Sequence, residues 1–265
     1  MVILMKQLKI LAVGDIVGPA AVECLSKNLW ALRREYGADF VVTNGENAAV
    51  GNGLDIAGAK SILYAGTDVI TSGNHIWQKN ELRGMLDDSP QLLRPVNYPA
   101  LCPGMGYTVR DADGWRILVI NVQGTVFMEP LDNPFNAVEH VLEREKGRYD
   151  FAVMDVHAEA TSEKLALAKY FDGKIHIVFG THTHVQTADA QVLPGGTGYI
   201  TDLGMTGPRD SILGVKNEII IERMRSKLPA RFTLSDSPVT LCGACFTLDP
   251  STGKCVSAEP VRRDF

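Results

Sequence analysis

"LKILAVGDIVGPAAVECLSKNLWALRREYGADFVVTNGEN", residues 8–47, decides the fold class of this chain. It opens with an apolar run that ends at Gly14, and Pro19 follows at a position typical of the first turn of a helix. Gly37 stands where such a helix would stop, and a second apolar run, "FVVTN", comes next. A strand, a helix and a strand in this order form the unit from which helix-covered parallel sheets are built.

The same alternation continues beyond this stretch. Residues 55–66 have the pattern of a second helix, and residues 68–75 that of a third strand. The segment "YTVRDADGWRILVINV" (residues 107–122) is different, because two strand-like runs are joined directly through Asp113 and Gly114. An Asp-Gly pair between such runs predicts a hairpin, so some strands should pair antiparallel.

The second half of the chain adds further elements of both kinds. We predict strands over 149–157 and 174–180, helices over 133–147, 161–171 and 214–227, and a closing hairpin over 239–261. No internal repeat, linker or low-complexity stretch divides the chain. The sequence therefore predicts an α/β fold of mixed, largely parallel β-sheets flanked by helices, in a single domain over residues 1–265.

Composition and charge exclude several classes of partner. The chain has 265 residues, of which 45% are hydrophobic and 22% charged, which is ordinary for a globular protein with a substantial core. Its formal net charge is −5. An acidic balance does not favour extended nucleic acid or an anionic membrane surface, so any phosphate binding should be local.

The start of the chain and the cysteine usage favour the cytoplasm. The opening segment "MVILMKQLKILAVGD" is interrupted by Lys6 and Lys9 and predicts a first core strand, not a signal peptide. Five cysteines without a framework spacing are typical of a reducing compartment. Cys242 and Cys245 lie three residues apart on a predicted strand, where they point to opposite faces and should not bind one ion together.

Residues able to bind metals follow five of the predicted strands. They are Asp15; Glu46 and Asn47; Asn74 and His75; His157; and His182 and His184. In open α/β folds the functional groups gather at the carboxyl ends of strands. Each residue alone is more often a cap, a turn former or a core group, but their recurrence at successive strand ends favours one shared site. His140, inside a helical pattern, and His176, inside a strand, lack this placement and are expected to be structural.

The donor set favours a pair of metal ions. Carboxylates, amides and imidazoles without thiolates suit iron, manganese or zinc better than calcium or a structural zinc site. With His75 left aside, seven side chains exceed what one tetrahedral ion can use, whereas two ions that share a bridging carboxylate are a recurrent device of phosphoester chemistry. The positive charge of two divalent ions exceeds the negative charge of two carboxylates. The site would therefore attract an anionic phosphate even on an acidic protein.

Taken in order, the motifs resemble those of a known superfamily. They are "GD" at 14–15, "GEN" at 45–47, "GNH" at 73–75, the strand-end His157 and "GTHTH" at 180–184. This series resembles the calcineurin-like metallophosphoesterase superfamily, and in detail its YmdB-like branch of cyclic-nucleotide phosphodiesterases. Two departures from the wider superfamily point to this branch: Val17 replaces a usual histidine, and Glu46 followed by Asn47 replaces the bridging aspartate.

The resemblance implies a sandwich fold and a role for each site residue. It implies two ligand sets, which are Asp15, Asn47 and His184 for one ion and Asn74, His157 and His182 for the other. Glu46 would bridge the ions, and Asn47 would substitute for the imidazole that Val17 removes. A hydroxide held between the ions would attack phosphorus, and His75 would act as the general acid that protonates the leaving alkoxide.

The expected activity is hydrolysis of small phosphodiesters, and the resemblance adds 2′,3′- or 3′,5′-cyclic nucleotides as substrates. Iron or manganese fits the oxygen-rich ligand set best, and zinc stays open. Two alternatives also stay open: a phosphomonoesterase or protein phosphatase with the same site, and a metal-binding regulatory protein with little catalysis. The expected partner is a small phosphodiester, with no membrane involved, and a homo-oligomer stays open.

Overall fold

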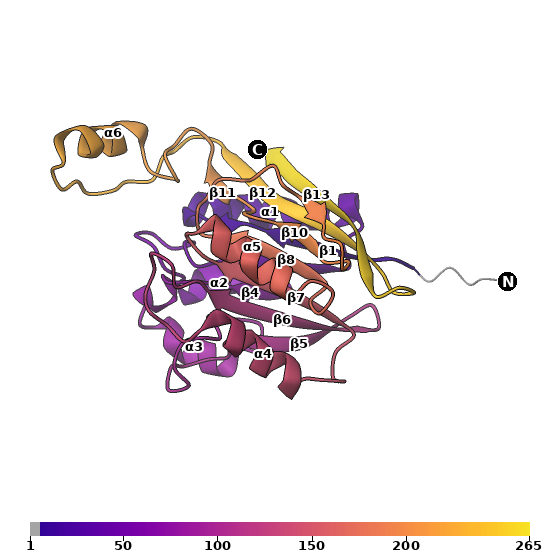
Figure 1. The fold of residues 1–265 in the computed structure, drawn as a ribbon. Helices are drawn as coiled ribbons and strands as arrows, with labels where there is room; N and C mark the ends of the chain where they lie inside the picture. The colour runs from indigo at the N-terminus through magenta and orange to yellow at the C-terminus, as the bar shows by residue number, and fades with distance from the viewer. Residues whose placement is uncertain (1–5) are drawn as a thin grey trace.

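The computed structural model describes residues 6–265 and shows two β-sheets packed face to face, with helices on their outer faces (Figure 1). The first sheet has the strand order β2-β11-β12-β1-β3-β4, with β13 paired to β12. Its strands are β1 (Leu8–Val13), β2 (Asp15–Ile16), β3 (Phe40–Asn44), β4 (Val69–Thr71), β11 (Met205–Pro208), β12 (Val239–Asp249) and β13 (Lys254–Asp264). The first core strand is confirmed as β1, whereas residues 1–5 of the predicted segment lie outside the described residues.

The second sheet has the order β5-β6-β7-β8-β10-β9. Its strands are β5 (Tyr107–Ala112), β6 (Trp115–Gln123), β7 (Phe151–His157), β8 (Ile177–Thr181), β9 (Gln191–Val192) and β10 (Gly198–Ile200). The helices are α1 (Gly18–Tyr36), α2 (Ile56–Tyr64), α3 (Leu82–Asp88), α4 (Pro134–Arg144), α5 (Thr161–Tyr170) and α6 (Asn217–Ser226), with a short 3₁₀ turn, η1 (Ile76–Gln78).

The central strands of both sheets, such as β1, β3, β7 and β8, are buried on both faces, and the molecule has three apolar layers. On β1, Leu11 and Val13 pack in the layer shared with α1, whereas Ile10 and Ala12 pack between the two sheets. A third layer lies between the second sheet and helices α4 and α5. The side chains of a strand alternate between its faces, and each face here meets an apolar neighbour. The predicted class, mixed sheets flanked by helices, is confirmed.

Local signals in the sequence explain the boundaries of the elements. Proline occupies the start of α1, and Gly37 ends it with the left-handed φ of 64°. Asp113 and Gly114 join β5 to β6 with φ values of 49° and 87°, the two positive values that a tight antiparallel hairpin requires. Parallel pairs join β1 to β3, β3 to β4, β6 to β7 and β7 to β8, as the alternation predicts.

The C-terminal hairpin inserts into the first sheet beside β1. Strand β12 pairs antiparallel with β1 on one side and with β13 on the other. Cys245 packs toward the helices, while its neighbours Ala244 and Phe246 face the second sheet. Cys242 lies an even number of residues from Ala244 and shares its face, so the two cysteines of the C-x-x-C point apart, as predicted. All five cysteines, which lie among residues 6–265, are free thiols.

An arm leaves the body between β11 and β12. We call residues 211–236 the arm; it contains α6 and projects from the rest of the molecule at the upper left of Figure 1. Among residues 6–265, no helix is both long and apolar enough to cross a membrane. The cytoplasmic location and the single domain over residues 1–265 stay predictions.

Candidate metal centre

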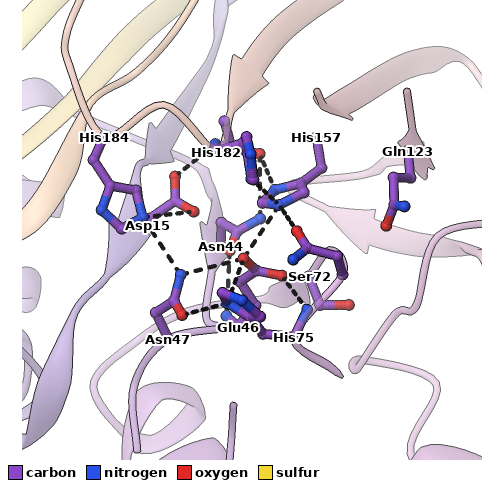
Figure 2. A network of polar contacts seen from close by, with 12 residues as sticks. Asp15, Asn44, Glu46, Asn47, Ser72, His75, Gln123, His157, His182 and His184 are labelled. Atoms are coloured by element: carbon purple, nitrogen blue, oxygen red, sulfur yellow. Dashed lines mark hydrogen bonds and ion pairs between the residues drawn. The ribbon is translucent and has the colours of Figure 1, made fainter. Parts of the chain in front are cut away.

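The five strand ends meet at one place. In the first sheet, Asp15 follows β1, Glu46 and Asn47 follow β3, and Asn74 and His75 follow β4. In the second sheet, His157 ends β7, and His182 and His184 follow β8. Figure 2 shows these side chains pointing toward a common centre, with Asp15 and His184 on one side and His157 and His182 on the other. Parallel strands place their carboxyl ends at one sheet edge, and the packing of the two sheets superposes these edges.

The tightest part of this centre joins four atoms with lone pairs. The Nε2 atom of His157 lies 3.2 Å from Oε1 of Glu46, 3.1 Å from Oδ1 of Asn74 and 3.1 Å from Nδ1 of His182. Ligand atoms of Glu46, His157 and His182 all lie within 4.8 Å of one another. One carboxylate, one amide oxygen and two imidazoles around a point form a donor set that suits a divalent transition metal. The structure thus contains a candidate metal-binding cluster.

The ring of His157 is oriented by its other nitrogen. Its Nδ1 lies 2.9 Å from Oγ1 of Thr181, and that hydroxyl donates to Oδ1 of Asp155 at 2.8 Å. Because the hydroxyl proton is committed to Asp155, Nδ1–H of His157 donates to Thr181, and Nε2, where a metal ion would replace a proton, faces the centre. Gly73 makes room for this ring, since a Cβ there would lie 2.0 Å from Cδ2 of His157.

The charges of the centre favour a bound cation. Burial lowers the pKa of His157, but the carboxylates of Glu46 and Asp15 outweigh it and raise the value to about 9. Burial opposes ionisation of Glu46, yet His157 and His75 hold the pKa of that carboxyl well below its usual range. Burial lowers the pKa of His182 to about 4, so its ring is neutral and able to bind a metal. The carboxylates that hold a proton on His157 also attract a metal ion, because both the proton and the ion carry positive charge.

A second group of donors lies beside the first. Oδ2 of Asp15 accepts from the amide of His182 at 3.2 Å, whereas Oδ1 is buried without a hydrogen-bond partner among residues 6–265. Nε2 of His184 lies 3.7 Å from this Oδ1. Burial raises the pKa of Asp15 against the opposing effect of His184 and His157, because ionising a buried carboxylate is costly. A cation between Asp15 and His184 removes that cost, so these residues fit a second ion.

Asn47 lies between this second group and His75. Its Oδ1 is 2.8 Å from Nδ1 of His75, while its Nδ2 is 3.2 Å from Oε1 of Glu46 and 3.4 Å from Nε2 of His184. The amide nitrogen, not the oxygen, thus faces the second group. Ligation by Asn47 requires a half-turn of the amide that exchanges these two atoms.

The centre opens into a pocket. A cavity of about 700 Å³ is lined by Glu46, Asn47, His75, His182 and His184 on one side, and side chains of the arm line the other. The amide of His75 donates to Oε2 of Glu46 at 3.0 Å, and its side chain retains 27% exposure. His140 lies in α4 and is exposed, and His176 accepts from the amide of Ala152 at 3.0 Å; neither lines this pocket.

The chain matches a known family along most of its length. The model of the family described as "YmdB-like protein" covers residues 11–261. The chain belongs to the YmdB-like family. It is 45% identical to the 2′,3′-cyclic-nucleotide 2′-phosphodiesterase of Bacillus subtilis (strain 168), over 96% of this chain and 96% of that protein.

Two solved structures place the YmdB-like chain among known folds. A crystal structure described as a novel phosphatase from Mycoplasma pneumoniae has a TM-score of 0.91 at 34% identity, covering 98% of this chain and 94% of that chain. A 5′-nucleotidase precursor from Thermus thermophilus has a TM-score of 0.57 at 12% identity, covering 98% of this chain and 55% of that chain. The second likeness, at 12% identity, shows the fold alone.

Val17, where the superfamily usually has histidine, has a packing role in this YmdB-like chain. It is 5% exposed and pairs with Asn47 in an isolated parallel bridge. A Cβ on Gly214 would lie 2.5 Å from Cγ1 of Val17, so the backbone of the arm passes directly over this side chain. Val17 therefore packs against the base of the arm.

Two acidic residues of the centre were missed at the level of sequence. Oε2 of Glu159 lies 3.2 Å from Nε2 of His182, the nitrogen opposite the cluster. Asp155 is fully buried in β7 and accepts hydrogen bonds from Asn44, Thr71 and Thr181, and burial raises its pKa to about 6. A signal for Asp155 existed, because it interrupts the apolar run "FAVMDVH"; Glu159 gave none.

A buried ion pair holds the backbone between His182 and His184. Nζ of Lys164 donates to Oδ2 of Asp202 and to the carbonyl of Thr181, both at 2.7 Å, and the same Oδ2 accepts from the hydroxyl of Thr183 at 2.8 Å. His182 and His184 have φ values of 98° and 64°, which non-glycine residues rarely adopt. Such strain persists only where neighbouring contacts hold it.

Lys164→Met is expected to lower the free energy of unfolding by about 3–5 kcal/mol, because it leaves the buried Asp202 carboxylate unpaired. Urea unfolding followed by circular dichroism measures this change. Lys27→Met is the matched control, since its ion pair with Glu23 is exposed and its loss should not measurably change stability. A loss below about 1 kcal/mol for Lys164→Met would contradict the structural role of the pair.

Proposed function

We propose that this YmdB-like protein hydrolyses small phosphodiesters at a dinuclear metal centre, and that 2′,3′-cyclic nucleotides are its preferred substrate class. The chain is a phosphoester hydrolase, in keeping with the names of its relatives. The observation that best supports the finer proposal is the convergence of Glu46, His157 and His182, with ligand atoms within 4.8 Å, beside an open pocket.

The proposed ligands form two sets around one shared carboxylate. They are Asn74, His157 and His182 for one ion, Asp15, Asn47 and His184 for the other, and Glu46 between them. The short contacts at His157 and the unpartnered oxygen of Asp15 among the described residues support this division. When bound, the two ions supply an activated water and positive charge against the phosphoryl oxygens. Oxygen and nitrogen donors favour iron or manganese, with zinc as the third candidate.

His75 is the proposed general acid. The leaving alkoxide of a ribose diester needs a proton, and His75 lines the pocket without belonging to either ligand set. When the amide of Asn47 turns its oxygen to the ion, its Nδ2 donates to Nδ1 of His75 over the present 2.8 Å contact. Nε2 is then the nitrogen of His75 that holds a proton toward the pocket. Asn47 would thereby couple metal binding to the tautomer of the His75 ring.

A substrate panel tests the proposed activity. Protein loaded with manganese or iron is expected to hydrolyse bis(p-nitrophenyl) phosphate and 2′,3′-cyclic AMP at least about 10-fold faster than p-nitrophenyl phosphate, and EDTA should abolish all three reactions. Initial rates under saturating metal measure the ratio. Preference for the monoester would instead support a phosphomonoesterase, and hydrolysis of none of them would support a regulatory metal-binding protein.

A further inference from the structure

The pocket beside the metal centre has two chemically different ends. One end presents the proposed ligands and His75, whereas the other is built by the arm. The arm end includes Leu213, Met224 and Phe232, which are 49%, 64% and 48% exposed. Apolar side chains exposed together in a cavity mark a binding surface for an apolar group. A substrate that fills both ends therefore joins an anionic diester to an apolar moiety.

The arm is held in a defined position at its base. The amide of Lys216 donates to the carbonyl of Thr233 at 3.0 Å, and that of Ser235 to Gly214 at 2.9 Å. Leu234 packs into the space left by Gly18, where a Cβ would lie 2.4 Å from its Cδ1. The two hydrogen bonds join the two ends of the arm to each other, and the Leu234 contact ties the arm to the start of α1, one residue beyond Val17. The apolar end of the pocket is thus preformed beside the metal centre, which lowers the cost of ordering it on binding.

The arm end also carries a stacked aromatic and cationic pair. The guanidinium of Arg223 lies 4.9 Å from the ring centroid of Phe232, and both side chains line the pocket, together with Lys227. Aromatic rings and guanidinium planes are the surfaces on which nucleobases stack, and stacking tolerates any base because every base has a π-face. An aliphatic group gains no stacking energy from such a pair, and its binding depends only on the apolar surface that it buries.

We propose that the arm is the nucleobase-binding wall of the site, with Phe232 and Arg223 as specificity-determining residues. This inference rests on the proposed function, because it places the diester of the same substrate at the metal centre. The substrate class is then a nucleoside cyclic phosphate rather than a base-free diester. The base lies against the arm and the phosphate lies beside His75.

The variant Phe232→Ala tests the role of the arm with two substrates, one that carries a base and one that lacks it. For 2′,3′-cyclic AMP, KM is expected to rise at least about 10-fold, as the loss of one stacking contact implies, with kcat changed less than about twofold. For glycerol 1,2-cyclic phosphate, which has no base, both constants should stay unchanged. Phe232→Trp should restore the low KM. Phe265→Ala is the matched control, since that phenylalanine is 44% exposed and lies outside the pocket lining.

The outcomes separate this inference from the proposed function. Equal rises of KM for both substrates in Phe232→Ala, or no rise for either, overturn the role of the arm while leaving the diesterase intact. If wild-type protein hydrolyses neither diester with manganese, iron or zinc, the proposed function fails. Calorimetric binding of adenosine 3′-monophosphate to metal-loaded protein then still decides the role of the arm: at least about 10-fold weaker binding by Phe232→Ala supports it, and equal binding overturns it.

Discussion

His75→Ala should lower kcat for 2′,3′-cyclic AMP by about 10²–10⁴ while leaving the metal content unchanged. The ring lies in the pocket, and its Nδ1 contacts Asn47 rather than an open coordination position. Its removal therefore deprives the leaving alkoxide of a proton but leaves both ligand sets intact. Steady-state kinetics, together with elemental analysis of the same sample, measures the two quantities at once.

The dependence on the leaving group makes this prediction specific. p-Nitrophenolate departs without protonation, so His75→Ala should lose much less activity on bis(p-nitrophenyl) phosphate than on the cyclic nucleotide. His140→Ala removes an exposed histidine of α4 and should behave as wild type. Equal losses on both diesters, or a fall in metal content, would show that His75 serves the metal site instead of the leaving group.

Glu46→Gln is expected to weaken metal binding by more than about 100-fold and to abolish turnover. Loss of a partner outside the ligand shell commonly costs 10–100-fold in metal affinity, and Glu46 is proposed as a ligand itself. Its Oε1 lies 3.2 Å from Nε2 of His157, and the carboxyl is fully buried, so its charge is unscreened by water. Metal content after gel filtration and calorimetric titration of the apoprotein measure the effect.

The control for Glu46→Gln is the same exchange at Glu145. That carboxylate is 8% exposed and contacts the hydroxyl of Tyr107 at 3.1 Å, away from the centre. Glu145→Gln should retain both ions and full activity. If Glu46→Gln retains two ions per chain with wild-type affinity, Glu46 does not bridge them and the proposed division of ligands is wrong.

Much of the fold followed from local signals. The alternation of apolar runs and helical patterns predicted the parallel pairs around β1 and β7, and Asp113-Gly114 predicted the hairpin of β5 and β6. These features depend on a few neighbouring residues, because backbone preferences and periodicity act over short distances. The prediction that metal-competent residues at strand ends meet also holds in the geometry, while their roles as ligands stay a proposal.

Contacts between distant segments could not be predicted. Asp155 accepts hydrogen bonds from Asn44, 111 positions away, and Lys164 pairs with Asp202, 38 positions away. The sequence shows a charged residue in an apolar context but not which partner compensates it. The direction of the Asn47 amide likewise depends on His75 and His184, which come from two other loops, as well as on the adjacent Glu46.

The amino-acid sequence by itself determined the order of the elements and the positions of the polar residues at the strand ends, since both depend on periodicity and on residue types that are adjacent in the chain. Only the tertiary structure decided how two sheets superpose those ends, how Val17 packs beneath the arm, and which apolar side chains face the metal centre. These depend on packing between segments far apart in the sequence, where the energy of a contact is set by the partner as much as by the residue.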